Sequence, residues 1–500
     1  MAARSRISCG ASALDRMAPN RSPSAFRHNA RMPSSHPLSR ESLFSRFGER
    51  YKWLVMSVVA TGTVAAVLLS TGFSVAVPVL MRHFRVGQHE VQLVVAAFIV
   101  ANTVAMLPSP WLVERYGLRR CFLAAIVVLF VSIVLGALSP NFAFLVVVRV
   151  VQGAVAGLLF PIGTMVVMRL FPADQQGRAS GFMGFGVILA PAVAPAVGGL
   201  MIDHWGWQAV FLMCLPFCIL AWFGAVRYLA LPGPRNHGDF DWPGMCALSL
   251  MTLALLVSAS SLGSDQHSTI FALSGAVLAL MALVWFLRHA RNPGAIVTDE
   301  VLRWRPVYTG MMVSFVYGFG VYGSSYLIPV FLQTVRGLSA TQAGGVLLPG
   351  GLVLAATLPL AGLLADRVAP YLIVMTGLTL FCASSAAMWF YATTISYSGL
   401  VWLTVLGRVG IGFLIAALNQ ASLRGLHGRI LGQSAMVVSY TRMLGGFLGV
   451  ALLAVFVQWR GTMLGSTSEA VGQAFCESFL ISALVFALAM IPAWRMKPIA

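Results

Sequence analysis

Residues 142–168, FAFLVVVRVVQGAVAGLLFPIGTMVVM, decide the fold class of this chain. They hold one charged side chain, Arg149, in a run longer than the roughly 20 apolar residues that a helix needs to cross the hydrocarbon core. The apolar residues are continuous and do not alternate at a period of two, which predicts a helix and not a strand of a membrane barrel. Because a helix satisfies its own backbone hydrogen bonds in lipid, the stretch predicts a membrane span.

Similar apolar stretches recur after residue 50 and predict fourteen spans in an order of six, two and six. The expected fold is an all-α polytopic membrane protein with two six-helix bundles and two inserted helices. The predicted spans are 53–80, 91–109, 122–138, 142–168, 180–202, 210–231, 245–262, 269–287, 307–332, 343–365, 371–392, 400–421, 431–457 and 475–494. The chain divides accordingly into 1–50, a disordered basic tail or an over-extended start; 51–231, the first bundle; 232–306, a connector with the inserted helices; and 307–500, the second bundle.

The composition excludes a soluble enzyme. Of the 500 residues, 58% are hydrophobic and 10% charged, whereas a soluble domain carries about 25% charged residues. The chain has no His-rich metal cluster, nucleophile elbow or paired intramembrane carboxylates, and no ATP-binding Gly-x-x-x-x-Gly-Lys-Ser/Thr loop. Cys214 and Cys218 share a helix face without a His or acid at ligand spacing, which favours packing. We therefore predict no enzyme, no primary pump, no cofactor and no metal site.

The net charge of +18 is distributed as membrane topology requires. With the first span running from inside to outside, 26 Lys and Arg residues fall on the cytoplasmic side, nine of them in the first fifty residues. Four lie outside (Arg82, Arg85, Arg336 and Arg460) and three lie within spans (Arg149, Arg408 and Arg442). This bias predicts a multi-pass protein of the cell inner membrane with both termini in the cytoplasm, and it makes a nucleic-acid partner unnecessary.

Two landmarks repeat between the halves at nearly the same offset. Residues 112–117 (LVERYG) are echoed by 364–369 (LADRVA), with the acids 252 positions apart. Residues 149–153 (RVVQG) are echoed by 408–412 (RVGIG), 259 positions apart. Two similar bundles that face each other across a central cavity are what alternating access needs, because rocking one half against the other exposes a site to each side in turn.

These landmarks resemble the major facilitator superfamily over residues 53–494. Residues 110–120 (PWLVERYGLRR) are similar to its loop between the second and third helices, with Pro110 in place of the usual Gly and Glu114 in place of the usual Asp. An acid beside clustered arginines at a helix end can bond to the facing bundle and hold an inner gate shut. The predicted gate residues are Glu114, Arg115, Gly117, Arg119, Arg120, Asp366 and Arg367. The alternative is a solvated turn whose charges only set topology.

Arg149 lies well inside the fourth span, where an unpaired charge costs at least about 3 kcal/mol by insertion scales. With Gln152 and Gly153 it resembles the superfamily's helix-four pattern Arg-x-x-Gln-Gly, which implies a part in proton transfer. The alternative is a structural arginine bonded to backbone carbonyls. We group Arg408 and Arg442 with these residues as candidates for transport and coupling.

The fifth span and the second half resemble the fourteen-span drug:proton antiporters of the EmrB/QacA branch. The segments that carry this resemblance are 326–339 (YLIPVFLQTVRGLS), 344–349 (GGVLLP) and 442–451 (RMLGGFLGVA). The antiporter-type helix is expected to use Gly184, Gly186, Pro191, Pro195, Gly198 and Gly199 for close approach and bending, a kinked packing helix being the alternative. The candidate cavity residues are Tyr317, Tyr322, Phe331 and Gln333, with packing as the alternative.

One departure concerns the coupling residue. Leu69 stands where relatives usually carry an Asp in the first helix, and none of the fifteen acids falls in the middle of a predicted span. The resemblance implies proton-coupled efflux of amphipathic small molecules, with a small-molecule substrate and lipid as partners and a periplasmic adaptor and outer-membrane channel left open. A dedicated exporter of a neutral or anionic metabolite is the alternative, and a membrane-embedded enzyme or non-transporting sensor is a third reading. The lack of acids favours neutral or anionic substrates.

Overall fold

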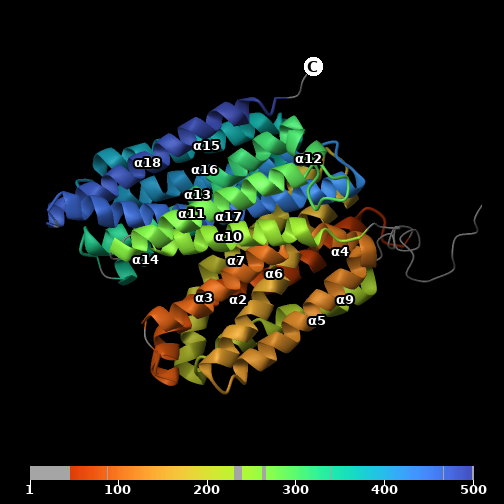
Figure 1. Ribbon diagram of the computed structural model, residues 1–500, viewed down its shortest axis with the longest axis horizontal. Coiled ribbons are helices and arrows are strands. Elements are labelled where there is room, and N and C mark those ends of the chain that lie inside the picture. Colours follow the sequence, from red (N-terminus) through yellow and green to blue (C-terminus); the bar gives the residue numbers. More distant parts are fainter. Residues whose placement is uncertain are drawn as a thin grey trace, which may run out of the picture.

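The computed structural model describes residues 46–86, 88–229, 239–261, 266–338, 340–465 and 467–497, and the elements in these ranges are helices (Figure 1). The first half comprises α2 (Arg50–Phe84), α3 (Gln88–Ala105), α4 (Ser109–Tyr116), α5 (Leu118–Ala137), α6 (Phe142–Leu170), α7 (Gln176–Trp205), α8 (Ala209–Leu212) and α9 (Leu215–Tyr228). The inserted pair is α10 (Trp242–Ser261) and α11 (Gln266–His289). The second half comprises α12 (Asp299–Arg303), α13 (Arg305–Thr334), α14 (Ala340–Arg367), α15 (Pro370–Tyr391), α16 (Tyr397–Leu423), α17 (Gly428–Met463) and α18 (Ser468–Trp494).

The helices confirm an all-α membrane protein. Among the described residues, twelve helical segments are long and apolar enough to cross a membrane, and the bent pair α3 and α4 supplies a thirteenth. Helix α7 has 30 residues, about 45 Å at 1.5 Å per residue, which also exceeds the roughly 30 Å hydrocarbon core. Counting α7, the helices match the predicted order of six, two and six. The predicted tail, 1–50, lies almost entirely outside the described residues, and the domain boundaries stay predictions.

The second predicted span, 91–109, ends differently from the prediction. Helix α3 stops at Ala105, and α4 starts at Ser109 after a bend of 54°. Pro108 and Pro110 flank this start and cannot donate backbone hydrogen bonds to a preceding turn, so they favour a break followed by a new helix. Most of the predicted loop is therefore helical, and Gly117, at φ 84°, makes the sharp link to α5 that a side chain would strain.

Glycines let helices within each half approach closely. A Cβ atom on Gly153 of α6 would lie 2.2 Å from the carbonyl oxygen of Phe98 in α3, and one on Gly157 would lie 2.1 Å from that of Asn102. In the second half, a Cβ atom on Gly445 of α17 would lie 2.0 Å from the carbonyl oxygen of Phe315 in α13. Small residues spaced by four are the usual means of bringing membrane helices into backbone contact.

The inserted helix α10 lies between the two halves and is bonded to the second. Figure 1 shows it running between them, and it contacts both α3 and α17. The Tyr440 hydroxyl of α17 lies 2.6 Å from Thr252 Oγ1 and donates to the Leu248 carbonyl at 3.0 Å. These contacts tie α10 to α17 inside the membrane.

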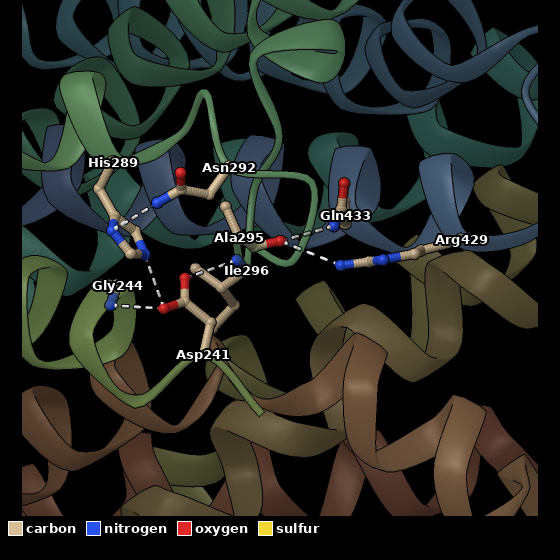
Figure 2. A network of polar contacts seen from close by, with 8 residues as sticks. All are labelled: Asp241, Gly244, His289, Asn292, Ala295, Ile296, Arg429 and Gln433. Atoms are coloured by element: carbon tan, nitrogen blue, oxygen red, sulfur yellow. Dashed lines mark hydrogen bonds and ion pairs between the residues drawn. The ribbon is translucent and has the colours of Figure 1, made fainter. Parts of the chain in front are cut away.

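A polar network fixes the segment between α11 and α12 on two sides (Figure 2). On one side, Asp241 accepts hydrogen bonds from the backbone N–H of Gly244 at 2.9 Å and of Ile296 at 2.8 Å, and it lies 2.8 Å from His289 Nε2. On the other side, the Ala295 carbonyl accepts from Arg429 Nη2 and Gln433 Nε2 of α17, both at 3.2 Å. The network attaches the end of the inserted pair to the first turns of α17.

The predicted orientation can be tested with reporter fusions. We expect a reporter fused after residue 500, or placed in the connector 232–238, to give a cytoplasmic signal, and one in the turn 265–268 to give a periplasmic signal, because the Lys and Arg bias sets the orientation. At each site, an alkaline phosphatase fusion is active on the periplasmic side and a fluorescent protein fusion on the cytoplasmic side, so the two reporters should give opposite signals. A periplasmic C-terminus would contradict both the orientation and an even number of spans.

Candidate transport site

The Arg149 side chain is buried inside the first half, with 1% of the residue exposed. Its Nη1 atom donates to the Leu69 carbonyl of α2 at 3.2 Å, and its Nε atom donates to the Val94 carbonyl of α3 at 3.3 Å. The guanidinium carbon lies 4.3 Å from the ring centroid of Phe98, a cation–π distance. The geometry thus contains the carbonyl-bonded arginine of the structural alternative, and its coupling role stays a prediction.

Gln152 extends the contacts of Arg149 to a fourth helix. Its Oε1 atom accepts from Arg149 Nη1 at 3.3 Å, and its Nε2 atom donates to the Ser132 carbonyl of α5 at 3.0 Å. Relatives usually carry an Asp at the position of Leu69, and here the Leu69 backbone carbonyl accepts the hydrogen bond from Arg149. A backbone acceptor leaves no trace in the sequence, so this contact was not predictable.

Arg408 and Arg442 of the second half have far fewer partners. Among the described residues, Arg408 Nη2 donates to Ser325 Oγ at 3.3 Å, and Arg442 Nη2 donates to Ser439 Oγ at 3.3 Å. Each guanidinium therefore keeps donors for another group within the described structure.

The four candidate cavity residues divide into three environments. Tyr322 is 42% exposed and rests its ring on Gly446 of α17, whereas Tyr317 is 4% exposed. Gln333 is exposed and donates to the Pro329 carbonyl of its own helix. Of the four, Tyr322 remains the candidate for contact with a substrate.

Phe331 takes the packing alternative in this structure. It is 1% exposed, and its ring packs 5.8 Å from Phe475 and 5.7 Å from Phe479 of α18. Because every face of a membrane helix is apolar, the sequence does not distinguish an aromatic that faces a neighbouring helix from one that faces a cavity.

Asp366 contacts the facing half through backbone groups and not through arginine side chains. Its carboxylate accepts from the backbone N–H of Gly177 at 2.7 Å and of Arg178 at 3.0 Å. These groups belong to the first turn of α7, where N–H groups lack helical partners and the helix dipole favours an anion. A carboxylate on one half therefore caps a helix of the other half, at the end predicted to be cytoplasmic.

Glu114 occupies the corresponding place in the first half. A Cβ atom on Gly432 in the second turn of α17 would lie 3.8 Å from Glu114 Oε1 and 3.2 Å from Pro110. Each half thus directs the acid of its repeated segment toward the beginning of a helix in the other half. Gln420 adds a further bond, since its Nε2 atom donates to the Ala173 carbonyl at 3.0 Å.

The predicted gate arginines make no described hydrogen bond to the facing half. Arg115 lies over the ring of Trp111 at 5.3 Å, and Arg119 donates to the Val226 carbonyl within its own half at 2.8 Å. Arg120 and Arg367 are exposed. Among the described contacts the Asp366 carboxylate, and not these arginines, bonds across the gate, because the free N–H groups at a helix start donate to it. The gating role of the arginines stays a prediction.

Helix α7 meets α14 of the second half through glycines that the sequence analysis missed. A Cβ atom on Gly181 would lie 2.5 Å from the Leu358 carbonyl oxygen, and one on Gly362 would lie 2.3 Å from that of Gly177. The spacing of Gly177 and Gly181 by four residues was the signal available in the sequence. Among the predicted helix residues, Gly184 also meets Leu358, at 3.5 Å.

The other predicted residues of α7 are placed only in part. A Cβ atom on Gly186 would lie 3.2 Å from Val64 of α2 in the same half, and Gly198 is buried. The side chains of Pro191 and Pro195, and the surroundings of Gly199, lie outside what the structure describes. Bending of α7 at these prolines stays a prediction.

A family model described as the Major Facilitator Superfamily matches residues 59–450. The chain belongs to this superfamily. It is similar to the MFS-type transporter YcnB of Bacillus subtilis, with 24% identity over 455 residues that cover 89% of this chain and 95% of the relative. It is also similar to the multidrug resistance protein B homolog of Mycobacterium tuberculosis, with 28% identity over 400 residues that cover 78% of this chain and 73% of the relative.

A solved structure of the proton:xylose symporter XylE shares the fold of this MFS protein. The TM-score is 0.62 at 17% identity, over 90% of this chain and 97% of that chain. Membership makes the chain a multi-pass membrane transporter and not an enzyme. The fourteen-span drug-exporting branch, the inner membrane and the cytoplasmic termini stay predictions.

Because the Asp366 carboxylate caps α7, we expect Asp366→Asn to weaken the contact between α14 and α7. The amide keeps the shape but loses the charge that a helix start favours by about 0.3–1 kcal/mol. We expect the population with separated ends of α7 and α14 to rise roughly two- to fivefold. Pulsed electron spin resonance between labels on Arg120→Cys and Arg424→Cys, with the other cysteines removed, measures this population.

The matched control for Asp366→Asn is Arg367→Gln, which alters the exposed neighbour and leaves the cap intact. We expect the control to keep the distance distribution of the parent protein. An unchanged distribution in Asp366→Asn, or equal shifts in both variants, would contradict a closing role for this carboxylate.

Proposed function

We propose that the protein is a secondary active exporter of amphipathic small molecules, driven by the proton gradient. The observation that carries this proposal is the seam of α7 and α14, where Asp366 caps the facing helix and glycines set the two backbones in contact. Such a closure depends on a few polar bonds and small residues, so it can open and re-form as the halves rock. The multidrug resistance homolog supports the substrate class, and the resemblance to drug:proton antiporters supports the direction and the driving force.

The proposed coupling has to operate without an evident acid in the described part of the membrane interior. Glu477 of α18 accepts from Arg460 Nε at 2.7 Å and Nη2 at 3.1 Å, and from Gln473 at 3.0 Å. This pairing engages Glu477 near the predicted outer side, which argues against its reaching the central region. The side chains of Glu90 and Asp203 lie outside the described residues.

The alternative substrate class, neutral or anionic metabolites, is favoured by Arg408 and Arg442. Each makes one hydrogen bond at 3.3 Å to a serine within the described part of the second half. A guanidinium has five N–H donors, so most of theirs are available to an anionic group. A lipophilic cation near these charges would lack the carboxylate or aromatic cage that it needs.

Arg149→Ala is expected to abolish transport while the protein still inserts in the membrane. Removing the charge eases insertion by up to about 3 kcal/mol, but it deletes the bonds that hold α6 to α2 and α3. Arg149→Lys should restore little activity, because an ammonium cannot reproduce the forked bonds of a guanidinium. Substrate flux in proteoliposomes, normalised to inserted protein, together with the melting temperature separates lost function from lost stability. Near-normal flux in Arg149→Ala would assign the residue to packing alone.

The preference for anionic over cationic substrates is testable with paired dyes of similar size. We expect faster saturable flux of the anionic dye in proteoliposomes, and a drop of about tenfold on Arg442→Gln, as for loss of one charge-assisted hydrogen bond. Arg336→Gln is the matched control, because Arg336 is bonded to the carbonyls of Ala392, Thr393 and Ile395 at a helix end.

Two outcomes would overturn this preference. One is faster flux of the cationic dye through the parent protein, and the other is an equal loss in both arginine variants. An acid introduced by Leu69→Asp is not a suitable test of the cavity charge. Leu69 is fully buried, and its carbonyl is bonded to Arg149, so the new carboxylate would lie beside that guanidinium.

A further inference from the structure

A small cavity lies inside the second half, separate from the seam between the halves. Its volume is about 20 Å³, room for about one water-sized particle. Four helices, α13, α15, α16 and α18, surround it. Its polar lining consists of Arg408 and the hydroxyls of Ser324, Ser384, Ser385, Thr404 and Ser482.

Arg408 brings unsatisfied donors to this cavity. Of its five N–H groups, one is bonded, to Ser325, among the described residues. Arg149, at the repeated position of the first half, is bonded to two carbonyls and Gln152 and lies against Phe98. Arg149 thus makes three described hydrogen bonds to protein groups, whereas Arg408 makes one.

Two hydroxyls add further donors on the same wall. Thr404 is 2% exposed, and its Oγ1 atom has no hydrogen-bond partner within the described structure. It precedes Arg408 by four residues on α16, which places both side chains on one helix face. Ser385 is also buried, and its hydroxyl makes no hydrogen bond to the described protein groups.

The remaining hydroxyls are already committed as donors. Ser384 donates to the Leu403 carbonyl at 2.7 Å, Ser482 to the Ser478 carbonyl at 3.0 Å, and Ser324 to the Val321 carbonyl at 3.2 Å. The uncommitted groups that face the cavity are therefore the N–H groups of Arg408 and the hydroxyls of Thr404 and Ser385. All of them can donate a hydrogen bond to one small acceptor.

Among the described side chains, no carboxylate forms an ion pair with Arg408. In the helices around the cavity and in α14, Asp366 caps α7 and Glu477 is paired with Arg460, while Glu469 lies at the exposed start of α18. Arg408 is half-buried, and a cation partly removed from water is stabilised by a counter-charge close to it. Convergent donors, positive charge and a cavity of atomic size together call for a small anion.

We propose that this cavity is a binding site for one small monovalent inorganic anion of the size of chloride, held by Arg408, Thr404 and Ser385. The bound anion neutralises the Arg408 charge and links α15 to α16 through shared hydrogen bonds. Because the cavity has room for about one particle of this size, we assign the anion as a resident ligand and not as the transported molecule. The inference rests on the cavity and not on the proposed export function; with an anion bound at Arg408, the arginine left for an anionic substrate is Arg442.

Equilibrium binding of radioactive chloride to the purified full-length protein tests the site directly. In detergent and sodium gluconate buffer, we expect saturable binding of about one chloride per chain, displaced by bromide. Thr404→Val keeps the side-chain shape and removes the hydroxyl, and we expect binding at least about tenfold weaker. Arg408→Gln should abolish it.

The matched control is Thr357→Val in the neighbouring helix α14. Thr357 is similarly buried, but its hydroxyl already donates to the Val353 carbonyl at 2.7 Å, so its removal should leave chloride binding unchanged. The melting temperature should rise with chloride relative to gluconate at constant ionic strength, and Thr404→Val should lose most of that rise while Thr357→Val retains it. Ser385→Ala provides a second test variant if Arg408→Gln does not fold.

Three outcomes would overturn the proposal. The parent protein could bind no chloride under these conditions, which would leave the cavity to water. Binding could be equal in the parent, Thr404→Val and Ser385→Ala, which would place the anion elsewhere. Gluconate could stabilise the protein as much as chloride at equal ionic strength, which would make the effect one of screening and not of a site.

Discussion

A positive charge inside hydrocarbon has to be surrounded by partners, and this constraint organises the centre of each half. In the first half, Arg149 meets it with the carbonyls of Leu69 and Val94, so one side chain joins α6 to α2 and α3. The same guanidinium sits against the ring of Phe98. The Arg149 charge, which opposes membrane insertion, is thereby stabilised by hydrogen bonds that also fix α6 relative to α2 and α3.

Glycines bring helices into backbone contact both within each half and between the halves, but the polar bonds beside these contacts differ. Gly153 sets α6 against α3 beside the bonded Arg149, so that seam is reinforced by a buried polar cross-link. Gly181 sets α7 against α14 at a similarly short distance, 2.5 Å against 2.2 Å for Gly153, and there the described polar support is the Asp366 carboxylate on the start of α7. The seam between the halves therefore has close packing with little cross-linking, as a surface that separates and re-forms requires.

Sequence reasoning predicted the features that depend on length, composition and repetition: the order of spans, the buried Arg149 and the paired acids at 114 and 366. It could not specify which face of an apolar helix meets a neighbour, as for Phe331, or which backbone groups become partners, as for Asp366 on α7. Backbone carbonyls and N–H groups occur at nearly every residue, so a sequence contains no mark of the ones that become partners. The break before α4 could have been predicted, because Pro108 and Pro110 interrupt a helix and both can be read from the sequence.

The inserted helices join the second half at the place where that half meets the first. Arg429 and Gln433 of α17 hold the Ala295 carbonyl, and Gly432 between them faces Glu114. The same turns of α17 therefore carry contacts to the inserted pair and to the first half, while Tyr440 binds α10 deeper in the membrane. If α17 moves away from α4, the segment around Ala295 has to follow α17 or lose its two hydrogen bonds to Arg429 and Gln433. Among the described residues, α10 makes no hydrogen bond to α3. Among the described residues, the inserted pair is thus hydrogen-bonded to the second half, while the ring of Phe240, just before α10, packs 4.9 Å from that of Trp111 in the first half.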